Sequence, residues 1–395
     1  MNVPNYSKIT RSIDEKIILT VFFSLLVSIQ IFAQPGRLDL NFLQVLLNDA
    51  NVSAIETQPD GKILIAGIFA SRSVILRRDI VRLNADGSLD STFSAGSGAN
   101  NSGLIRFIKL QTDGKIIIAG NFTQINGEFR RAIARLNPNG SIDTTFNVSG
   151  IDVSFVNDLD VQTDGKILIS AQNSTGNSFV ARLNTNGSND SGVDVPLFQA
   201  SGGFNYRVSF VPTENKILVG GNFSYTVNQT AYKNLARLNL DGTIDSTFTT
   251  NVTNATFDLL INIKPIGGGK ILIFGRFDSV NQTTRRNIAI LNNDGSLDVS
   301  FNPATSGTEI FISVAVQTNG KIIVGGVNFS SNTFVRGNVA RLNADGSVDT
   351  TFNQGKGANA DVRALNILSN DKLLIGGTFS KYHIFPRTGL AQINL

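Results

Sequence analysis

One pattern of residues recurs seven times along the chain and constrains its fold more than any other feature. Its clearest copy reads TDGKIIIAGNF over residues 112–122 and ARLNPNGSIDTTF over residues 134–146. The copies lie 50 to 54 residues apart, as their shared lysines show: Lys62, Lys115, Lys166, Lys216, Lys270, Lys321 and Lys372. A period of about 50 residues built from short strands is typical of a β-propeller, in which each repeat forms one blade.

Each copy contains four candidate strands, named A to D here. In the second copy they span residues 105–110, 115–122, 133–137 and 142–146. An Asp-Gly or Asn-Gly pair commonly separates A from B and C from D. These residues accept the positive φ angles of tight hairpins. We therefore predict that every repeat is a four-stranded antiparallel blade.

The two ends of the chain complement each other. The seventh copy stops after its strand C, at residues 390–395, whereas residues 36–42 read as a strand D with no A, B or C before it. A blade built from both ends would close the ring and leave no exposed sheet edge. We therefore predict an all-β, seven-bladed β-propeller over residues 34–395, closed by an N-terminal strand that completes the last blade.

Phenylalanine also recurs with the repeat. Six Phe end strand B: Phe69, Phe122, Phe223, Phe277, Phe329 and Phe379. Six more end strand D: Phe42, Phe93, Phe146, Phe248, Phe301 and Phe352. We interpret these rings as packing between neighbouring blades, because large apolar side chains are the main source of core stability.

The N-terminal segment resembles an export signal. Residues 17–33 form an apolar run that follows three basic residues. We interpret residues 1–33 as a signal peptide cleaved between Ala33 and Gln34, with an uncleaved membrane anchor as the alternative. Both interpretations place residues 34–395 in the periplasm, on the cell surface or in the medium. No further membrane segment is predicted.

The DGKILIAG pattern, together with ARLNxDGSLDxTF, resembles the delta-60 repeat family of bacterial extracellular proteins. The resemblance covers nearly all of residues 36–395. The third copy departs from it, with Ser170-Ala171-Gln172 in strand B and no Thr-Phe pair after Asp190. The resemblance implies a propeller used for binding or scaffolding. It implies no activity and no site residues.

The inventory of reactive side chains argues against catalysis. The chain has no cysteine and one histidine, His383, so neither a Ser-His-Asp relay nor a His-based metal site is favoured. Most aspartates belong to the repeat, in turns or at the start of strand D. We predict a non-catalytic protein without a cofactor. The alternative is an extracellular enzyme that acts on polysaccharide with two of the remaining carboxylates.

The C–D turn has two interpretations. Residues 84–90 read NADGSLD and place oxygen-bearing side chains at alternate positions around a glycine, as calcium loops do. A hairpin turn stabilised by the Asp side chain requires the same residues. Asn139 and Asn186 replace the central Asp86 in the next two copies, which keeps the turn but removes the charge. The turn is therefore favoured over the calcium site.

The strongest functional candidate is a basic set just before strand C. In a meander, the B–C and D–A connections share one face of the ring, and here they are longer and more variable than the other turns. Binding residues collect in such loops. The set comprises Arg77, Arg78, Arg130, Arg131, Lys233, Arg285, Arg286, Arg336 and Arg387.

These basic residues predict a rim that binds an anionic glycan or an acidic protein. The alternative is that they pair with neighbouring acids or cover apolar surface with their stems. A net charge of +4 is too small to indicate a nucleic-acid partner. We expect a monomer.

Overall fold

The computed structural model describes residues 34–42, 47–71, 78–100, 103–192, 206–227, 229–253, 260–327, 337–352 and 355–395. Within these ranges every regular element is a β-strand and none is a helix. The predicted signal peptide or anchor, residues 1–33, lies outside them. No helix of the described chain is long and apolar enough to cross a membrane.

Seven three-stranded antiparallel sheets in the described ranges repeat one plan and are numbered here in chain order. Sheets 1 to 3 contain β1 (Leu47–Thr57), β2 (Ile63–Ser71) and β3 (Arg78–Leu83); β4 (Ile105–Leu110), β5 (Ile116–Gly120) and β8 (Ile133–Leu136); and β9 (Phe155–Val161), β10 (Ile167–Gln172) and β11 (Ser178–Leu183). Sheets 4 and 5 contain β12 (Arg207–Val211), β13 (Lys216–Val227) and β14 (Thr230–Leu238), then β16 (Leu260–Ile266), β17 (Lys270–Arg276) and β20 (Ile288–Leu291). Sheets 6 and 7 contain β21 (Ile310–Val316), β22 (Ile322–Val327) and β23 (Val339–Leu342), then β24 (Val362–Ile367), β25 (Lys372–Gly377) and β28 (Leu390–Asn394).

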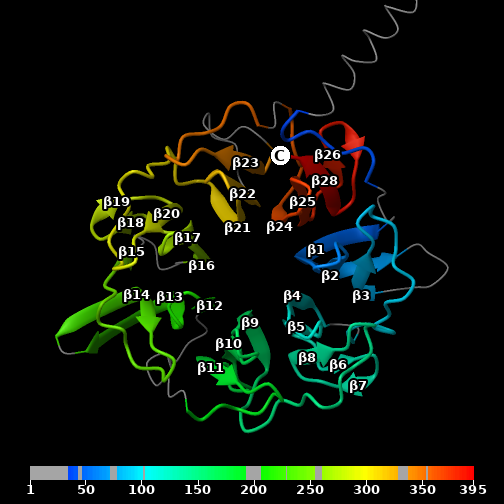
Figure 1. The fold of residues 1–395 in the computed structure, drawn as a ribbon, viewed down its shortest axis with the longest axis horizontal. Helices are drawn as coiled ribbons and strands as arrows, with labels where there is room; N and C mark the ends of the chain where they lie inside the picture. The colour runs from blue at the N-terminus through cyan, green and yellow to red at the C-terminus, as the bar shows by residue number, and fades with distance from the viewer. Residues whose placement is uncertain are drawn as a thin grey trace, which may run out of the picture.

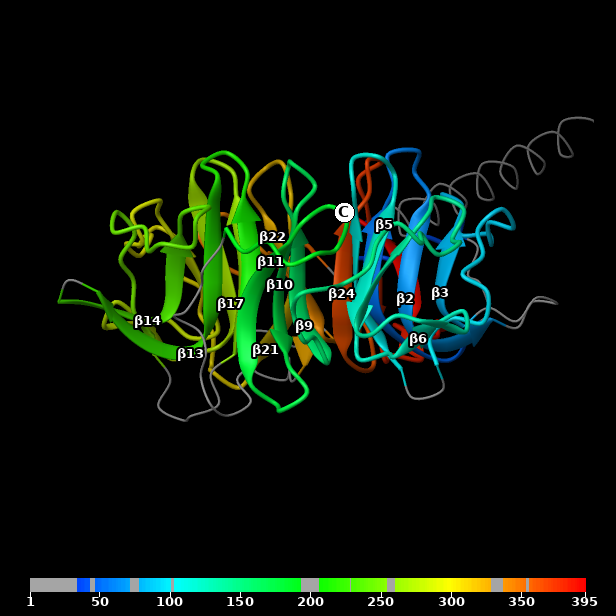
Figure 2. The ribbon, with the colours of Figure 1, turned by 90° about the horizontal axis from the view of Figure 1, so that it is seen from below.

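The sheets surround a common axis (Figure 1). The A strands lie nearest the centre, and the C strands lie farther out. The A strands are β1, β4, β9, β12, β16, β21 and β24. From the side, the strands stand roughly along the axis and the sheets lie next to one another (Figure 2). This is the arrangement of a β-propeller.

The predicted strand D forms a single bridge rather than a full strand. In sheet 2, Ile142 bridges Leu136, and the amide of Asp143 donates to the carbonyl of Arg135 (2.9 Å). The Asp143 carboxylate then accepts hydrogen bonds from the amide and the hydroxyl of Thr145 (2.9 and 2.7 Å). Such a turn leads the chain away from the sheet. The same bridge recurs after β3, β11, β14, β20 and β23, so the prediction of four full strands per blade is wrong.

The apolar core lies between successive sheets. Between sheets 1 and 2, Leu64 and Ile80 pack with Phe93 and Phe122. Sheets 7 and 1 share a cluster of the same kind, as do the other consecutive pairs. Every described phenylalanine of the two repeat positions is buried, which confirms their interpretation as packing residues. Phe329 lies outside the described residues.

A buried arginine forms an ion pair within its own repeat and a hydrogen bond to the next one. In sheet 2, Asp143 accepts from Arg135 Nε (2.7 Å) and from Lys115 Nζ (2.8 Å). The Arg135 guanidinium lies 5.0 Å from the centre of the Phe146 ring, and its Nη1 donates to the carbonyl of Thr185 in the next repeat (2.6 Å). Equivalent pairs occur in sheets 1, 3, 4 and 6: Arg82–Asp90, Arg182–Asp190, Arg237–Asp245 and Arg341–Asp349.

The N-terminal segment lies beside β28, the last strand. The amide of Gly36 donates to the Asn394 carbonyl (2.8 Å), and the amide of Asp39 donates to the Gln392 carbonyl (2.8 Å). The Asp39 carboxylate accepts from the Gln392 side chain (3.0 Å) and pairs with Lys372 (3.3 Å). Asp39 therefore takes the place in sheet 7 that the aspartate of strand D takes in the other sheets.

Candidate binding site

The B–C connections of several sheets are ordered hairpins. In sheet 2, β6 (Gln124–Ile125) pairs with β7 (Glu128–Phe129) through Asn126 and Gly127, whose φ angles are 52° and 79°. Asn-Gly is the pair that such a tight turn favours. Sheets 5 and 7 carry the equivalent hairpins β18 (Ser279–Val280) with β19 (Thr283–Thr284) and β26 (Lys381–Tyr382) with β27 (Phe385–Pro386). In sheet 4, β13 and β14 themselves extend to form the hairpin.

These hairpins pair with the D–A connection that leads into their own sheet. Ala99 bridges Ile125, Ala358 bridges Tyr382, and β15 (Val252–Thr253) pairs with β18. The B–C and D–A connections therefore lie at the same end of the sheets, as the sequence predicted. We call this end the hairpin face.

Three of the predicted basic residues occupy equivalent positions after the hairpins of sheets 2, 5 and 7. The Nη1 atoms of Arg130, Arg285 and Arg387 donate to the carbonyl oxygens of the residues before them (2.7, 3.0 and 2.9 Å). Burial lowers the pKa of Arg387. These side chains therefore lie against the hairpins that carry them.

The second arginine of each pair contacts the next D–A connection. Arg131 pairs with Asp152 (3.3 Å) and donates to the Ser154 hydroxyl (3.2 Å), while Arg286 donates to the carbonyl of Ser306 (3.2 Å). An exposed pair of this kind contributes at most about 1 kcal/mol to stability.

The remaining members of the predicted set are spread over other sheets. Lys233 lies exposed in the sheet 4 hairpin. Arg77, Arg336 and the side chain of Arg78 lie outside the described residues. The described members of the set therefore lie in the B–C connections of sheets 2, 4, 5 and 7.

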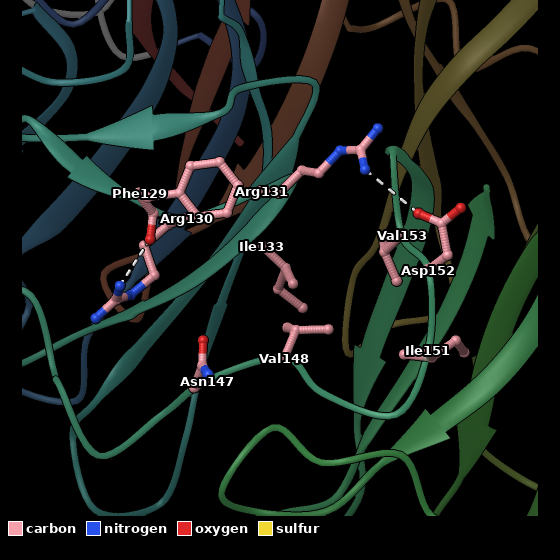
Figure 3. Close-up of a pocket in the computed structure, with 9 residues that line it drawn as sticks. All are labelled: Phe129, Arg130, Arg131, Ile133, Asn147, Val148, Ile151, Asp152 and Val153. Carbon is pink, nitrogen blue, oxygen red and sulfur yellow. Dashed lines mark hydrogen bonds and ion pairs between the residues drawn. The ribbon is translucent and has the colours of Figure 1, made fainter. Parts of the chain in front are cut away.

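A pocket of about 210 Å³ lies between the sheet 2 hairpin and the D–A connection that leads to sheet 3 (Figure 3). The lining residues are Phe129, Arg130, Arg131, Ile133, Asn147, Val148, Ile151, Asp152 and Val153. Figure 3 shows Arg131 reaching across to Asp152, with Ile133 and Val148 between the two walls. The Phe129 side chain is 68% exposed. The pocket therefore combines an exposed ring, two cations and an apolar floor.

The charge of Asp152 and the apolar walls determine what this pocket could bind. Hydrogen bonds from Ser174 lower the pKa of Asp152, so its carboxylate is ionised at neutral pH. Asp152 is the one carboxylate among the lining residues. Glycoside hydrolysis usually needs two carboxyl groups that flank the scissile bond. Apolar walls with a few polar groups at fixed positions are typical of ligand sites.

Sequence reasoning identified Arg130 and Arg131 but missed Phe129 and Asp152. Phe129 directly precedes the basic pair, where the equivalent residues in sheets 5 and 7 are Thr284 and Pro386. The aromatic side chain of Phe129, which the equivalent positions lack, could therefore have indicated the site from the sequence. Asp152 gave no such signal, because its connection has no fixed pattern.

Six segments of the chain match a family model described as a "domain of unknown function (DUF5122) beta-propeller". They span residues 58–93, 111–146, 162–192, 215–248, 269–301 and 317–352, together more than half of the chain. Each segment includes strands B and C and the segment that bridges strand C. The comparison with curated proteins found no match.

Solved structures resemble this fold at low sequence identity. A virginiamycin B lyase from Staphylococcus aureus is 10% identical, with a TM-score of 0.53 over 89% of this chain and 98% of that one. The extracellular domain of a putative one-component system from B. thetaiotaomicron is 13% identical, with a TM-score of 0.50 over 91% of this chain and 42% of that one. At such identities the likeness shows the fold alone.

Proposed function

Because the chain belongs to the DUF5122 β-propeller family, we propose that it is a non-catalytic binding or scaffolding protein, secreted or exposed at the cell surface. Its proposed ligand is an acidic glycan bound on the hairpin face. The pocket at Phe129 carries this proposal, because an exposed ring offers a flat apolar surface to a sugar while Arg130 and Arg131 offer charge-assisted hydrogen bonds to its acid groups.

The proposed architecture is a closed ring of seven blades. Two observations support it. Apolar clusters join every consecutive pair of sheets, including sheets 7 and 1. Leu38 packs in the cluster that sheets 6 and 7 share, and Phe42 packs in the cluster that sheets 7 and 1 share. A ring of this kind would hold the hairpins of all blades on one face, so a long ligand could contact several at once.

The proposal of a binding protein rather than an enzyme rests on the pocket. It holds one carboxylate, and the single histidine, His383, belongs to the hairpin of a different sheet. Binding to an intact polysaccharide without release of reducing ends would support the proposal. Steady release of reducing ends would favour the enzyme.

Export is the first expectation of this proposal. The apolar run before Ala33 should direct secretion, so the mature chain should begin at Gln34. Mass spectrometry of the exported protein is expected to show the loss of residues 1–33. An intact Met1 in a membrane fraction would contradict cleavage and support the anchor.

Loss of the rim charges is expected to abolish binding without unfolding the protein. Replacement of Arg130, Arg131, Arg285 and Arg286 by serine removes exposed or half-buried groups that make few contacts. We expect a melting temperature within a few degrees of the parent and no measurable affinity for polygalacturonate. Parent binding should weaken as salt rises, because exposed charges are screened beyond about 8 Å at physiological ionic strength.

The quadruple lysine variant is the matched control, since it keeps the charge and should retain much of the binding. Dextran, which carries no charge, should not bind. Failure of the parent chain to bind polygalacturonate at low salt would contradict the proposed function. Unfolding of the serine variant would show that these arginines are structural.

A further inference from the structure

Three arginines from separate sheets lie near the same end of the inner strands. Arg106 belongs to β4, Arg207 to β12 and Arg363 to β24, all of which are inner strands (Figure 1). None of the three belongs to the outer basic set or to the pocket at Phe129. Their sheets are not neighbours, so each arginine approaches the axis from a different direction.

The strand registers place these residues at the same level. Arg106 and Arg363 are the unpaired residues of two equivalent irregularities, between Ile105 and Phe107 and between Val362 and Ala364. Arg207 pairs with Gly220 at the corresponding end of β12. This is the end farthest from the A–B turns, so the arginines lie toward the hairpin face.

Two of the guanidinium groups are fixed across sheet boundaries. Arg207 donates from Nε to the Asn262 side chain (2.9 Å) and from Nη1 to the Asn157 carbonyl (2.9 Å). Arg363 donates to the Asn51 side chain (3.0 Å) and pairs with Asp361 (3.0 Å). Hydrogen bonds on both sides of each group hold its position before any ligand arrives.

Arg106 differs from the other two. It is exposed, and its Cζ lies 5.0 Å from the centre of the Phe155 ring. Within the described part of the chain it has no hydrogen bond or ion pair. A guanidinium has five N–H donors, and the face-on contact with a ring leaves them directed outward.

The charges of Arg207 and Arg363 act on Arg106. Partial burial of its guanidinium against the neighbouring strands lowers the pKa of Arg106 most, and the charges of Arg207 and Arg363 lower it further. The inner strands next to β4 are β1 and β9, whereas Arg207 and Arg363 are carried by β12 and β24. Their influence therefore reaches Arg106 across the axis, where three like charges repel one another.

One level closer to the A–B turns, the inner strands carry equal numbers of acidic and basic side chains. Four charged residues share one register position on their inner strands, because each pairs with the residue two positions after its repeat lysine. They are Glu56, Lys109, Asp160 and Lys264. Lys109 pairs with Asp160 at 3.0 Å. The charges of the two acids and the two lysines cancel at this level. The cation without a counter-ion in the described chain, Arg106, lies at the level of the arginines.

The carboxylates near the arginines already have partners. Asp361 pairs with Arg363, and Asp158 accepts from the Val208 amide (3.1 Å). Burial raises the pKa of Asp158 to about 6. Neither acid is bonded to Arg106, whose donors therefore remain for a ligand.

We propose that Arg106, Arg207 and Arg363 form an axial site for the oxyanion of a small acidic ligand, with Arg106 as its main donor. Carboxylates and sulfates share this chemistry, since both accept charge-assisted hydrogen bonds from guanidinium groups. The site goes beyond the proposed function, because it uses none of the residues of the outer rim.

Isothermal titration at pH 7 and low salt, with sodium sulfate and with galacturonate in separate experiments, tests the site. Wild-type protein should bind at least one of the two, and the preferred anion identifies the ligand class. Arg106→Gln should weaken binding roughly tenfold or more, as expected for loss of hydrogen bonds to a charged group. Its melting temperature should stay unchanged, because Arg106 donates no hydrogen bond within the described chain.

Lys381→Gln, which removes the charge of an exposed lysine outside the outer basic set, is the control and should leave binding of the small anion unchanged. If Arg106→Gln fails to fold, Arg106→Lys keeps the charge with fewer donors and should bind several-fold more weakly. The proposal is overturned if wild-type protein binds neither anion, if Arg106→Gln or a folded Arg106→Lys binds as tightly as wild type, or if Lys381→Gln loses as much affinity as Arg106→Gln. None of these outcomes depends on binding to polysaccharide.

Discussion

A chain that begins at residue 43 is expected to melt at least about 10 °C below a chain that begins at residue 34. The truncation removes Leu38 and Phe42, whose side chains are 2% and 4% exposed. Burial of each contributes about 1.5–3 kcal/mol, and the lost hydrogen bonds between Asp39 and Gln392 add to this. Removal also exposes the edge of β28, so aggregation should increase.

Circular dichroism and light scattering during heating measure both effects. Leu38→Ser and Leu40→Ser are a matched pair within the segment, because Leu40 is 46% exposed. Leu38→Ser should destabilise the protein strongly, and Leu40→Ser should have little effect. Equal melting temperatures for the truncated and longer chains would rule out a closing role for the segment.

Asp143→Ala is expected to cost about 3–5 kcal/mol of unfolding free energy, because it leaves the buried guanidinium of Arg135 without its anion. Urea unfolding at pH 7 measures this cost. Asp298 of sheet 5 provides a matched control: it pairs with Lys270, but Ile290 stands where sheets 1 to 4 and sheet 6 have arginine. Asp298→Ala should therefore cost about 1 kcal/mol or less.

The same clusters predict acid sensitivity. Hydrogen bonds from Lys166 and Arg182 lower the pKa of Asp190 to about 2, from an ordinary value of 3.8. A lowered carboxyl pKa stabilises the folded state at neutral pH, and this contribution is lost as the pH falls through 3.8 toward 2. Unfolding free energy should therefore fall over this range. Equal losses of unfolding free energy in Asp143→Ala and Asp298→Ala would contradict the role of the buried ion pair. An unfolding free energy that stays constant between pH 4 and 2 would contradict the predicted acid sensitivity.

The repeat predicted most of the fold because its residues act locally. Asp-Gly and Asn-Gly fix the hairpins, and the β-branched runs between them fix the strands. The fourth strand was over-predicted for an equally local reason. Asp143 and Thr145 look like the start of a strand in the sequence, but their side chains bond to form a turn.

The candidate sites were predictable only in part. Arg130 and Arg131 stood out because they recur in register. Arg106 and Arg363 did not, because the influence of one charge on the other depends on how inner strands of separate repeats lie around the axis. The role of Arg135 was also missed. It belongs to the repeat motif, but its bond to Thr185 crosses to the next sheet, which no periodicity within one repeat reveals.

The contact between Asp39 and Gln392 joins residues separated by 353 positions in the chain. During synthesis, Asp39 is therefore made long before Gln392, its partner in β28. Contacts of such long separation form slowly, since loop-closure entropy must be overcome before they are gained. Until β28 is complete, the segment that lies beside it has no partner strand, and the sheets between them can assemble only as an open arc. We therefore expect the pairing of the N-terminal segment with β28 to be a late step of folding.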